Sequence, residues 1–157
     1  MRKTQQKPFF AVLVFCVFLQ INLYIIKVLC SIMNFLDNLF ITQSITETED
    51  GFEAVVRCNS DHDVYKAHFP GNPITPGACM LQEAGVLMQE KKGRPVFLKQ
   101  AKSIKYLSLL IPAEGKEVKF IFSRVVDGET ECKAQVAIAD ENIVYTKMSL
   151  TYSYEAL

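Results

Sequence analysis

The chain has 157 residues, half of them hydrophobic, and its formal net charge is zero. This length allows one domain with a full hydrophobic core and leaves little room for a second. From residue 33 onward, 13 Lys and Arg residues stand against 17 Asp and Glu residues without forming a basic stripe, so nucleic acid is not expected as a partner.

The cysteines are odd in number and scattered, and none forms a Cys-x-x-Cys pair. They are Cys16, Cys30, Cys58, Cys79 and Cys132. This usage is typical of reduced thiols in a cytoplasmic protein, and we expect neither a disulfide framework nor a metal site. For Cys79, we expect a buried packing role.

Residues 1–32 differ from the rest of the chain. Basic residues precede an uncharged apolar run at residues 9–19, and a second apolar stretch follows at residues 21–30. This pattern is typical of a secretory signal or of a marginal membrane anchor. No Ala-x-Ala cleavage signature follows the apolar run, which argues against a signal peptide.

Two interpretations of this N-terminal segment stay open. A membrane span would include Lys27, at a cost of up to about 3 kcal/mol, and would anchor the protein to a membrane. Alternatively, translation begins at Met33 and the upstream residues are a mis-assigned start. In either case we expect a single domain over residues 33–157, in a cytoplasmic protein unless the segment is a genuine anchor.

The first elements of this domain are predicted as a β-hairpin. Residues 39–48 have a β-like pattern, Glu49-Asp50-Gly51 is a turn signal, and residues 52–58 form a β-branched strand. Residues 59–63 are predicted as a polar loop, in which His62 is expected to be solvated.

The most constrained stretch of the sequence begins at His68. It reads His-Phe-Pro-Gly-Asn-Pro-Ile-Thr-Pro-Gly and leads directly into an apolar, helix-compatible segment. Its prolines and glycines indicate a rigid loop that places His68 beside a helix N-terminus. Because first-turn N–H groups lack intrahelical acceptors, such a terminus can bind a carbonyl oxygen or an anion. His68 is therefore a candidate for acid–base chemistry.

A helix is expected from Gly77 to about Lys92, with Gly93 ending it. The segments after it are strand-like and separated by turns, of which Asp127-Gly128 is the strongest hairpin signal. The expected strands cover residues 96–107, 117–126, 130–139 and 143–154. One long helix against a mostly antiparallel sheet defines an α+β roll.

The stretch from His68 to Gly77, followed by an apolar helix, resembles the active-site signature of the FabA/FabZ-type β-hydroxyacyl-acyl-carrier-protein dehydratases. The order of elements from about Leu39 to Tyr154 is also similar. The resemblance implies a hotdog fold, in which one long central helix is wrapped by a mostly antiparallel sheet. Residues 1–32 have no counterpart in that family.

The resemblance also implies a reaction and its partners. A 3-hydroxyacyl thioester, carried on the phosphopantetheine of acyl carrier protein, would lose water to give the trans-2-enoyl thioester in fatty-acid or related acyl-chain biosynthesis. His68 would abstract the α-proton, and the Gly77 N–H would polarise the thioester carbonyl. No further cofactor is implied. The family arrangement is a homodimer, or a multiple of dimers, in which the loop histidine and the helix carboxylate come from opposite subunits.

The sequence departs from the family at the carboxylate position, which is Gln82. Glu83 follows one residue later, a rotation of about 100° on a helix, so it replaces that carboxylate only through a register shift or bulge. A Gln amide can hold a hydroxyl but cannot donate a proton near neutral pH. Loss of a general acid costs roughly 100- to 10,000-fold in rate. We place Gln82 in the catalytic set as a weakened partner, and the candidate substrate-binding residues are Phe69, Pro76, Ala78 and Glu83.

Two other functions remain open. A hotdog acyl thioesterase needs a carboxylate to activate water or to attack, and this would be Glu83. The missing acid also suits a non-catalytic acyl-carrier-binding subunit that completes a mixed dimer with a catalytic paralogue.

Overall fold

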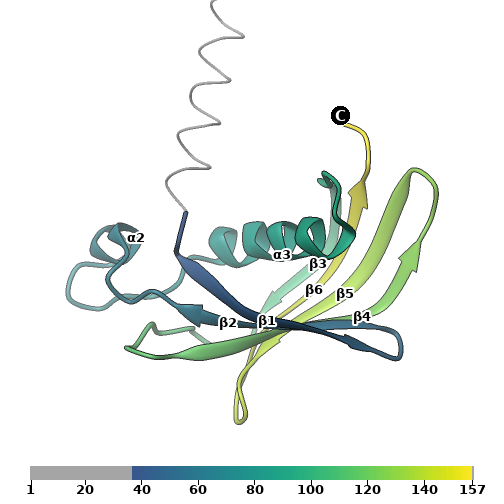
Figure 1. The fold of residues 1–157 in the computed structure, drawn as a ribbon. Helices are drawn as coiled ribbons and strands as arrows, with labels where there is room; N and C mark the ends of the chain where they lie inside the picture. Colours follow the sequence, from purple (N-terminus) through teal and green to yellow (C-terminus); the bar gives the residue numbers. More distant parts are fainter. Residues whose placement is uncertain (1–36, 157) are drawn as a thin grey trace, which may run out of the picture. The chain divides into compact units, whose positions relative to one another are not determined.

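The computed structural model describes residues 37–156 (Figure 1). Their elements are β1 (Phe40–Thr48), β2 (Gly51–Cys58), α2 (Asp63–Ala67), α3 (Gly77–Lys92), β3 (Phe97–Tyr106), β4 (Glu117–Asp127), β5 (Glu131–Ala139) and β6 (Val144–Ser153). The predicted signal, anchor or mis-assigned start at residues 1–32, with Met33, lies outside the described residues. Within residues 37–156, no helix is long and apolar enough to cross a membrane.

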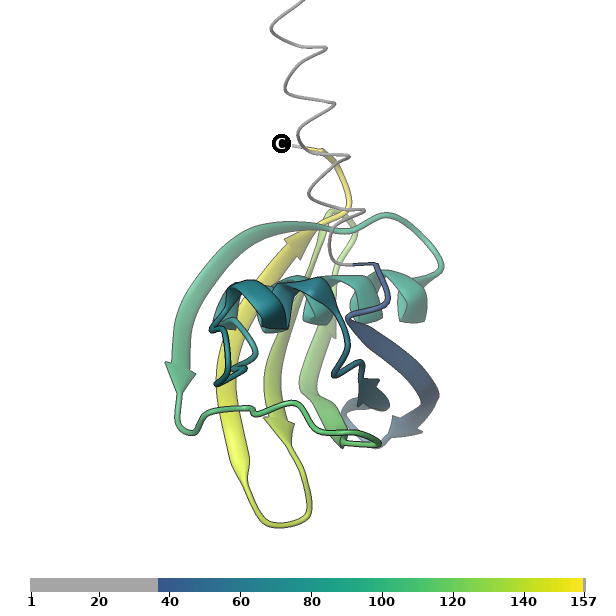
Figure 2. The same ribbon diagram turned by 90° about the vertical axis from the view of Figure 1, so that its left-hand side faces the viewer.

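The six strands form one antiparallel sheet in the order β1-β2-β4-β5-β6-β3. The sheet curves around α3, which lies along its concave face (Figure 2). This is the predicted α+β roll, and each predicted strand lies within two residues of its observed bounds.

Alternating side chains of the central strands build the core against α3. Strand β4 buries Val118, Phe120 and Phe122, while the residues between them are more accessible. The rings of Phe52 and Phe122 stack at 4.1 Å, which joins β2 to β4. The period of two in the sequence arises because successive side chains of a strand point to opposite faces.

Helix α3 starts and ends where the sequence predicts. Pro76 is its N-cap residue, and Gly93 ends the helix in the left-handed conformation with φ 61°. Lys91 forms an ion pair with Glu47, and Lys92 lies 2.7 Å from Asp127. These contacts tie the C-terminal end of the helix to the turns of the sheet.

The short helix α2 was not predicted. His62 is its N-cap residue, and the His62 Nδ1 accepts a hydrogen bond of 3.1 Å from the Val64 N–H. The expectation that His62 is only a solvated loop residue is therefore wrong. Histidine is not among the usual N-cap residues, so propensity alone did not indicate a helix start there.

Strands β1 and β3 are the two edges of the sheet. Strand β3 is exposed along almost its whole length although it contains apolar residues. Phe97, Leu98 and Tyr106 expose 39%, 41% and 53% of their surfaces. An edge with unpaired backbone groups and exposed apolar side chains is typical of a strand that pairs with another chain.

Candidate active site

His68 directly follows α2, and both its backbone and its ring are held. The His68 N–H donates to the Val64 carbonyl at 2.9 Å, and the ring atom Nδ1 lies 3.1 Å from the Ile74 carbonyl oxygen. Because a carbonyl oxygen can only accept, Nδ1 is the protonated nitrogen in this contact. In the neutral ring, Nε2 then retains the lone pair of a base.

Backbone hydrogen bonds across the loop hold its shape. The Ile74 N–H donates to the His68 carbonyl, and the Asn72 N–H donates to the Phe69 carbonyl, each at 3.0 Å. Gly71 adopts a φ of 76°, a region that favours glycine over residues with a side chain. These contacts agree with the predicted rigid loop.

A buried hydroxyl pair and one backbone contact fasten the loop to its surroundings. The hydroxyls of Thr75 and Tyr65 lie 3.0 Å apart, and both residues are buried. The Thr75 N–H donates to the Leu110 carbonyl at 2.8 Å, so the chain after β3 runs beside the loop. This second segment belongs to the site, although the motif contains no sign of it.

The N-terminus of α3 has no side-chain cap. The N–H groups of Cys79 and Met80 both donate to the Pro76 carbonyl, and the first turn contains no acidic residue. The N–H groups of Gly77 and Ala78 have no acceptor within the helix. Such an end can hold a carbonyl oxygen that gains negative charge.

Tyr106, at the end of β3, packs directly against Gly77. A Cβ placed on Gly77 would lie 2.4 Å from the Tyr106 ring carbon Cζ and 2.5 Å from its hydroxyl oxygen. A side chain at position 77 would therefore require the Tyr106 ring to move. No local pattern in the sequence indicates Tyr106, because nothing local links a strand end to a helix start so far away in the chain.

The helix residues expected to assist catalysis lie on an uninterrupted α-helix. Since α3 is continuous from Gly77 to Lys92, neither a bulge nor a register shift brings Glu83 to the position of Gln82. Within the described part of the chain, no hydrogen bond or ion pair joins either side chain to His68. In a single chain, the structure therefore groups His68 with the loop, and Gly77 with Tyr106, but does not pair His68 with a helix carboxylate.

Glu83 nevertheless has unusual electrostatics. Burial raises the pKa of its carboxyl group to about 7, and the negative charge of Glu90 adds to the increase. A carboxyl group with this pKa is partly protonated at neutral pH. It is thus the one helix side chain of the candidate set that can give or take a proton.

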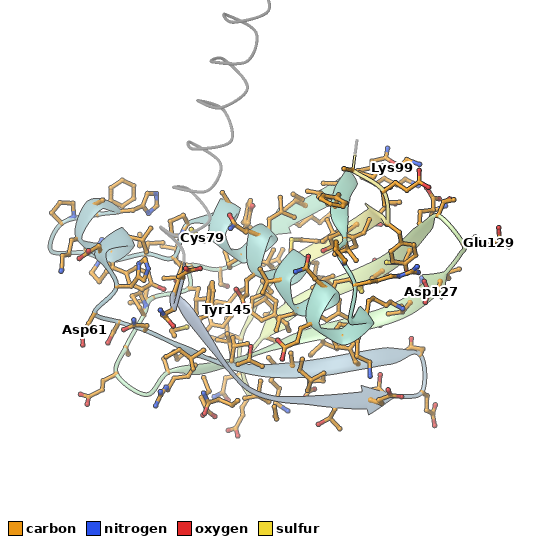
Figure 3. The ribbon with its side chains drawn as sticks, turned by 45° about the horizontal axis from the view of Figure 1, so that its top comes forward. Asp61, Cys79, Lys99, Asp127, Glu129 and Tyr145 are labelled. Atoms are coloured by element: carbon orange, nitrogen blue, oxygen red, sulfur yellow. The ribbon has the colours of Figure 1, made fainter. Side chains whose placement is uncertain are left out.

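The remaining candidates differ in accessibility. Phe69 is 51% exposed, with its ring centroid 4.1 Å from that of His68, and Ala78 is exposed while Pro76 is partly buried. Cys79 is buried at the α2 end of α3, and burial raises the pKa of its thiol, in agreement with the predicted packing role (Figure 3). Cys58 and Cys132 are likewise buried free thiols.

The chain is similar to known dehydratases in sequence. A 3-hydroxyacyl-[acyl-carrier-protein] dehydratase FabZ of Latilactobacillus sakei is 27% identical over 124 residues, which cover 66% of this chain and 89% of the relative. The FabZ of Acetivibrio thermocellus is 28% identical over 116 residues, covering 60% and 80%.

Solved structures show the same fold at low identity. The dehydratase heterocomplex ApeI:P from Xenorhabdus doucetiae aligns with a TM-score of 0.55 at 12% identity, covering 73% of this chain and 97% of that one. A hypothetical thioesterase with coenzyme A from Streptococcus pneumoniae aligns with a TM-score of 0.52 at 19% identity, covering 72% and 85%.

The fold and these relatives define a hotdog protein of the FabA/FabZ dehydratase class, as the sequence resemblance implied. The family model named ApeI-like, described as ApeI dehydratase, matches residues 44–147. The chain belongs to the ApeI-like dehydratase family.

Proposed function

We propose that this protein removes water from a 3-hydroxyacyl thioester, carried by acyl carrier protein, to give the trans-2-enoyl thioester. The observation that carries the proposal is His68, whose Nδ1 is held by the Ile74 carbonyl while Nε2 is left as a base, on the loop that leads into the uncapped start of α3. The FabZ relatives support the substrate class, since their names specify 3-hydroxyacyl-[acyl-carrier-protein] substrates.

In this reaction, Nε2 of His68 takes the proton from the carbon next to the thioester carbonyl. The electron pair of that C–H bond moves toward the carbonyl, whose oxygen gains negative charge. The Gly77 N–H at the helix terminus donates a hydrogen bond to this oxygen. One fixed donor of this kind is typically worth ~3 kcal/mol of the barrier.

The second half of the reaction expels the hydroxyl group from the β-carbon. The electron pair returns to form the carbon–carbon double bond, and the leaving hydroxyl takes up the proton that Nε2 of His68 removed from the α-carbon and departs as water. Gln82 would hold this hydroxyl by hydrogen bonds without supplying the proton. We therefore expect a slower enzyme than one with a carboxylic acid at this position.

We also propose a homodimer as the working assembly, with acyl carrier protein as its partner. The exposed apolar edge strand β3 supports pairing with a second copy of the chain. In such a dimer, helix α3 of one copy could approach the loop of the other, which would supply the helix side chain that His68 lacks within one chain. The proposed reaction requires no cofactor besides the arm of the carrier protein.

The decisive experiment is turnover of a 3-hydroxyacyl carrier by the purified full chain, followed by enoyl absorbance. We expect formation of the enoyl thioester by wild type and a loss of at least roughly 100-fold in His68→Ala, because the base is removed. An inert wild-type protein, or equal rates for the two proteins, would contradict the proposed function.

A second candidate function is favoured by Gln82 itself. A chain without the acid could serve as the carrier-binding subunit of a mixed dimer, and one structure of the same fold is a dehydratase heterocomplex. In that case the isolated protein would be inert and would raise the turnover of a dehydratase partner when the two are mixed. Equal turnover of the partner with and without this chain would exclude the role of a carrier-binding subunit.

The raised pKa of Glu83 keeps thioesterase chemistry as a third candidate, because this carboxyl group can exchange protons near neutral pH. Release of free thiol from an acyl carrier, abolished in Glu83→Gln but retained in His68→Ala, would favour hydrolysis. Thiol release that persists in Glu83→Gln would contradict it.

A further inference from the structure

We propose that the Tyr106 hydroxyl is a second hydrogen-bond donor to the thioester carbonyl oxygen, beside the Gly77 N–H. The inference rests on the proposed function and adds a residue that the family motif does not contain. It concerns a tyrosine hydroxyl that the fold places against the first residue of α3.

The Tyr106 hydroxyl lies beside the first residue of α3. The Tyr106 hydroxyl oxygen lies 2.5 Å from where a Gly77 Cβ would be, and the ring carbons Cζ and Cε1 lie at 2.4 and 2.6 Å. Since a Cβ is one bond from Cα, the hydroxyl lies within van der Waals range of the Gly77 backbone. An oxygen atom bound by the Gly77 N–H would therefore be close to this hydroxyl.

The Tyr106 hydroxyl is also available to a substrate. Tyr106 is 53% exposed, and within residues 37–156 its hydroxyl forms no hydrogen bond. By contrast, the Tyr65 hydroxyl is 3.0 Å from Thr75 and the Tyr145 hydroxyl donates to Asp140 at 2.6 Å. A phenol at the surface, with its polar end unpartnered at the candidate site, is free to donate to a substrate.

A catalytic hydrogen-bond donor has to be held in place before the reaction, and the backbone at Tyr106 meets this requirement. Tyr106 pairs with Thr146 in the sheet. Immediately after it, the N–H groups of Leu107 and Ser108 both donate to the Tyr145 carbonyl, at 2.7 and 3.2 Å. The backbone on both sides of Tyr106 is thus fixed by β6, which limits the directions available to the ring.

The proposed reaction also benefits from a second donor to the thioester oxygen. Gln82 cannot protonate the leaving hydroxyl, so the C–H bond breaks before the C–O bond is assisted, and negative charge accumulates on the thioester oxygen. A second donor stabilises that charge at the stage where Gln82 supplies no proton to the leaving hydroxyl. The phenol donates a hydrogen bond and keeps its proton, so the balance of the reaction is unchanged.

The test compares the wild-type full chain with Tyr106→Phe, which keeps the ring and removes only the hydroxyl. The first readout is the infrared carbonyl stretch of bound trans-2-butenoyl-pantetheine, which needs no turnover. We expect the stretch to shift to lower frequency in wild type, with a smaller shift in Tyr106→Phe. The second readout is dehydration, for which we expect kcat to fall roughly 10- to 100-fold with KM within about threefold.

Tyr154→Phe is the matched control, since its hydroxyl contacts Asp127 near the opposite end of α3. It should leave both readouts unchanged. Equal carbonyl shifts in wild type and Tyr106→Phe would overturn the inference, even if the variant were less stable or slower. A hydroxyl-dependent shift without turnover by wild type would support the Tyr106 contact and contradict the proposed dehydration.

Discussion

The neighbouring side chains Gln82 and Glu83 pose the main chemical question of this protein. Gln82 stands where the sequence resemblance implies a carboxylic acid, and its amide has no proton to give, while Glu83 has a proton available but points about 100° away on a continuous helix. The loop half of the site, with its oriented histidine, does not share this defect. We therefore expect the leaving-group step to limit the rate.

This expectation is tested by Gln82→Glu, which restores a carboxyl group on the same helix face. We expect dehydration to accelerate roughly 10- to 100-fold, since a positioned general acid contributes at least that much. The measurement is enoyl formation at saturating substrate, with Gln89→Glu, an exposed position near the other end of α3, as control. Equal rates for Gln82→Glu and wild type would place the slow step elsewhere.

Glu83 should also make stability depend on pH. Its folded-state pKa of about 7 lies above the unfolded value of 4.5, so the folded state binds the proton more tightly. The contribution of Glu83 to the free energy of unfolding is then largest below pH 4.5 and is lost as the pH rises to about 7. Glu83→Gln removes this loss.

We expect the free energy of unfolding of Glu83→Gln, relative to wild type, to rise by up to roughly 3 kcal/mol between pH 4.5 and pH 8. Urea denaturation across this range measures it. Glu90→Gln should reproduce a smaller part of the gain, because the Glu90 charge is only the second cause of the shift. A difference that does not change with pH would contradict the raised pKa of Glu83.

At the scale of elements, two glycines that look alike in the sequence have opposite roles. Gly51 opens β2, where a Cβ would lie 2.0 Å from the Phe122 carbonyl oxygen of the neighbouring strand. Gly85 is in the middle of α3, where a Cβ would meet the Tyr152 ring at an ordinary 3.7 Å. The first glycine permits a close approach between strands, whereas the second weakens a helix.

These two glycines give a matched prediction. Gly85→Ala should raise the free energy of unfolding by about 0.5 to 1 kcal/mol, through the higher helix propensity of alanine. Gly51→Ala should lower it by roughly 1 to 3 kcal/mol, because the strands must move apart. Thermal and urea denaturation of both variants measure the signs. Stabilisation by Gly51→Ala would contradict the close contact of β2 with β4.

At the scale of the whole molecule, the exposed edge strand β3 leads us to expect a dimer. The mass in solution should be close to twice the 17.8 kDa of one chain, as measured by light scattering. Leu98→Lys, on β3, should shift the protein toward monomer and reduce activity. Val126→Lys replaces an apolar residue that is 64% exposed on β4. This control variant should remain a dimer and keep its activity. A monomeric wild type, or a Leu98→Lys variant that remains fully dimeric, would contradict this interface.

The sequence alone determined those features that depend on short-range chemistry. The period-two strands, the turn at Asp127 and the helix ending at Gly93 follow from local backbone preferences, and they were predicted to within two residues. The loop from His68 to Gly77 could also be predicted, because proline and glycine restrict the backbone wherever they occur. Helix α2 was missed, because its cap is an imidazole nitrogen.

Only the tertiary structure brought together residues that are distant in the chain. Tyr106 lies on Gly77 because β3 returns along β6 to the start of α3, and no local pattern encodes that contact. Burial of Glu83 raises its pKa for the same reason, since desolvation depends on everything packed around the carboxyl group. The sequence thus determined the histidine loop and the order of elements, whereas the packing of sheet and helix decided which other groups can act beside them.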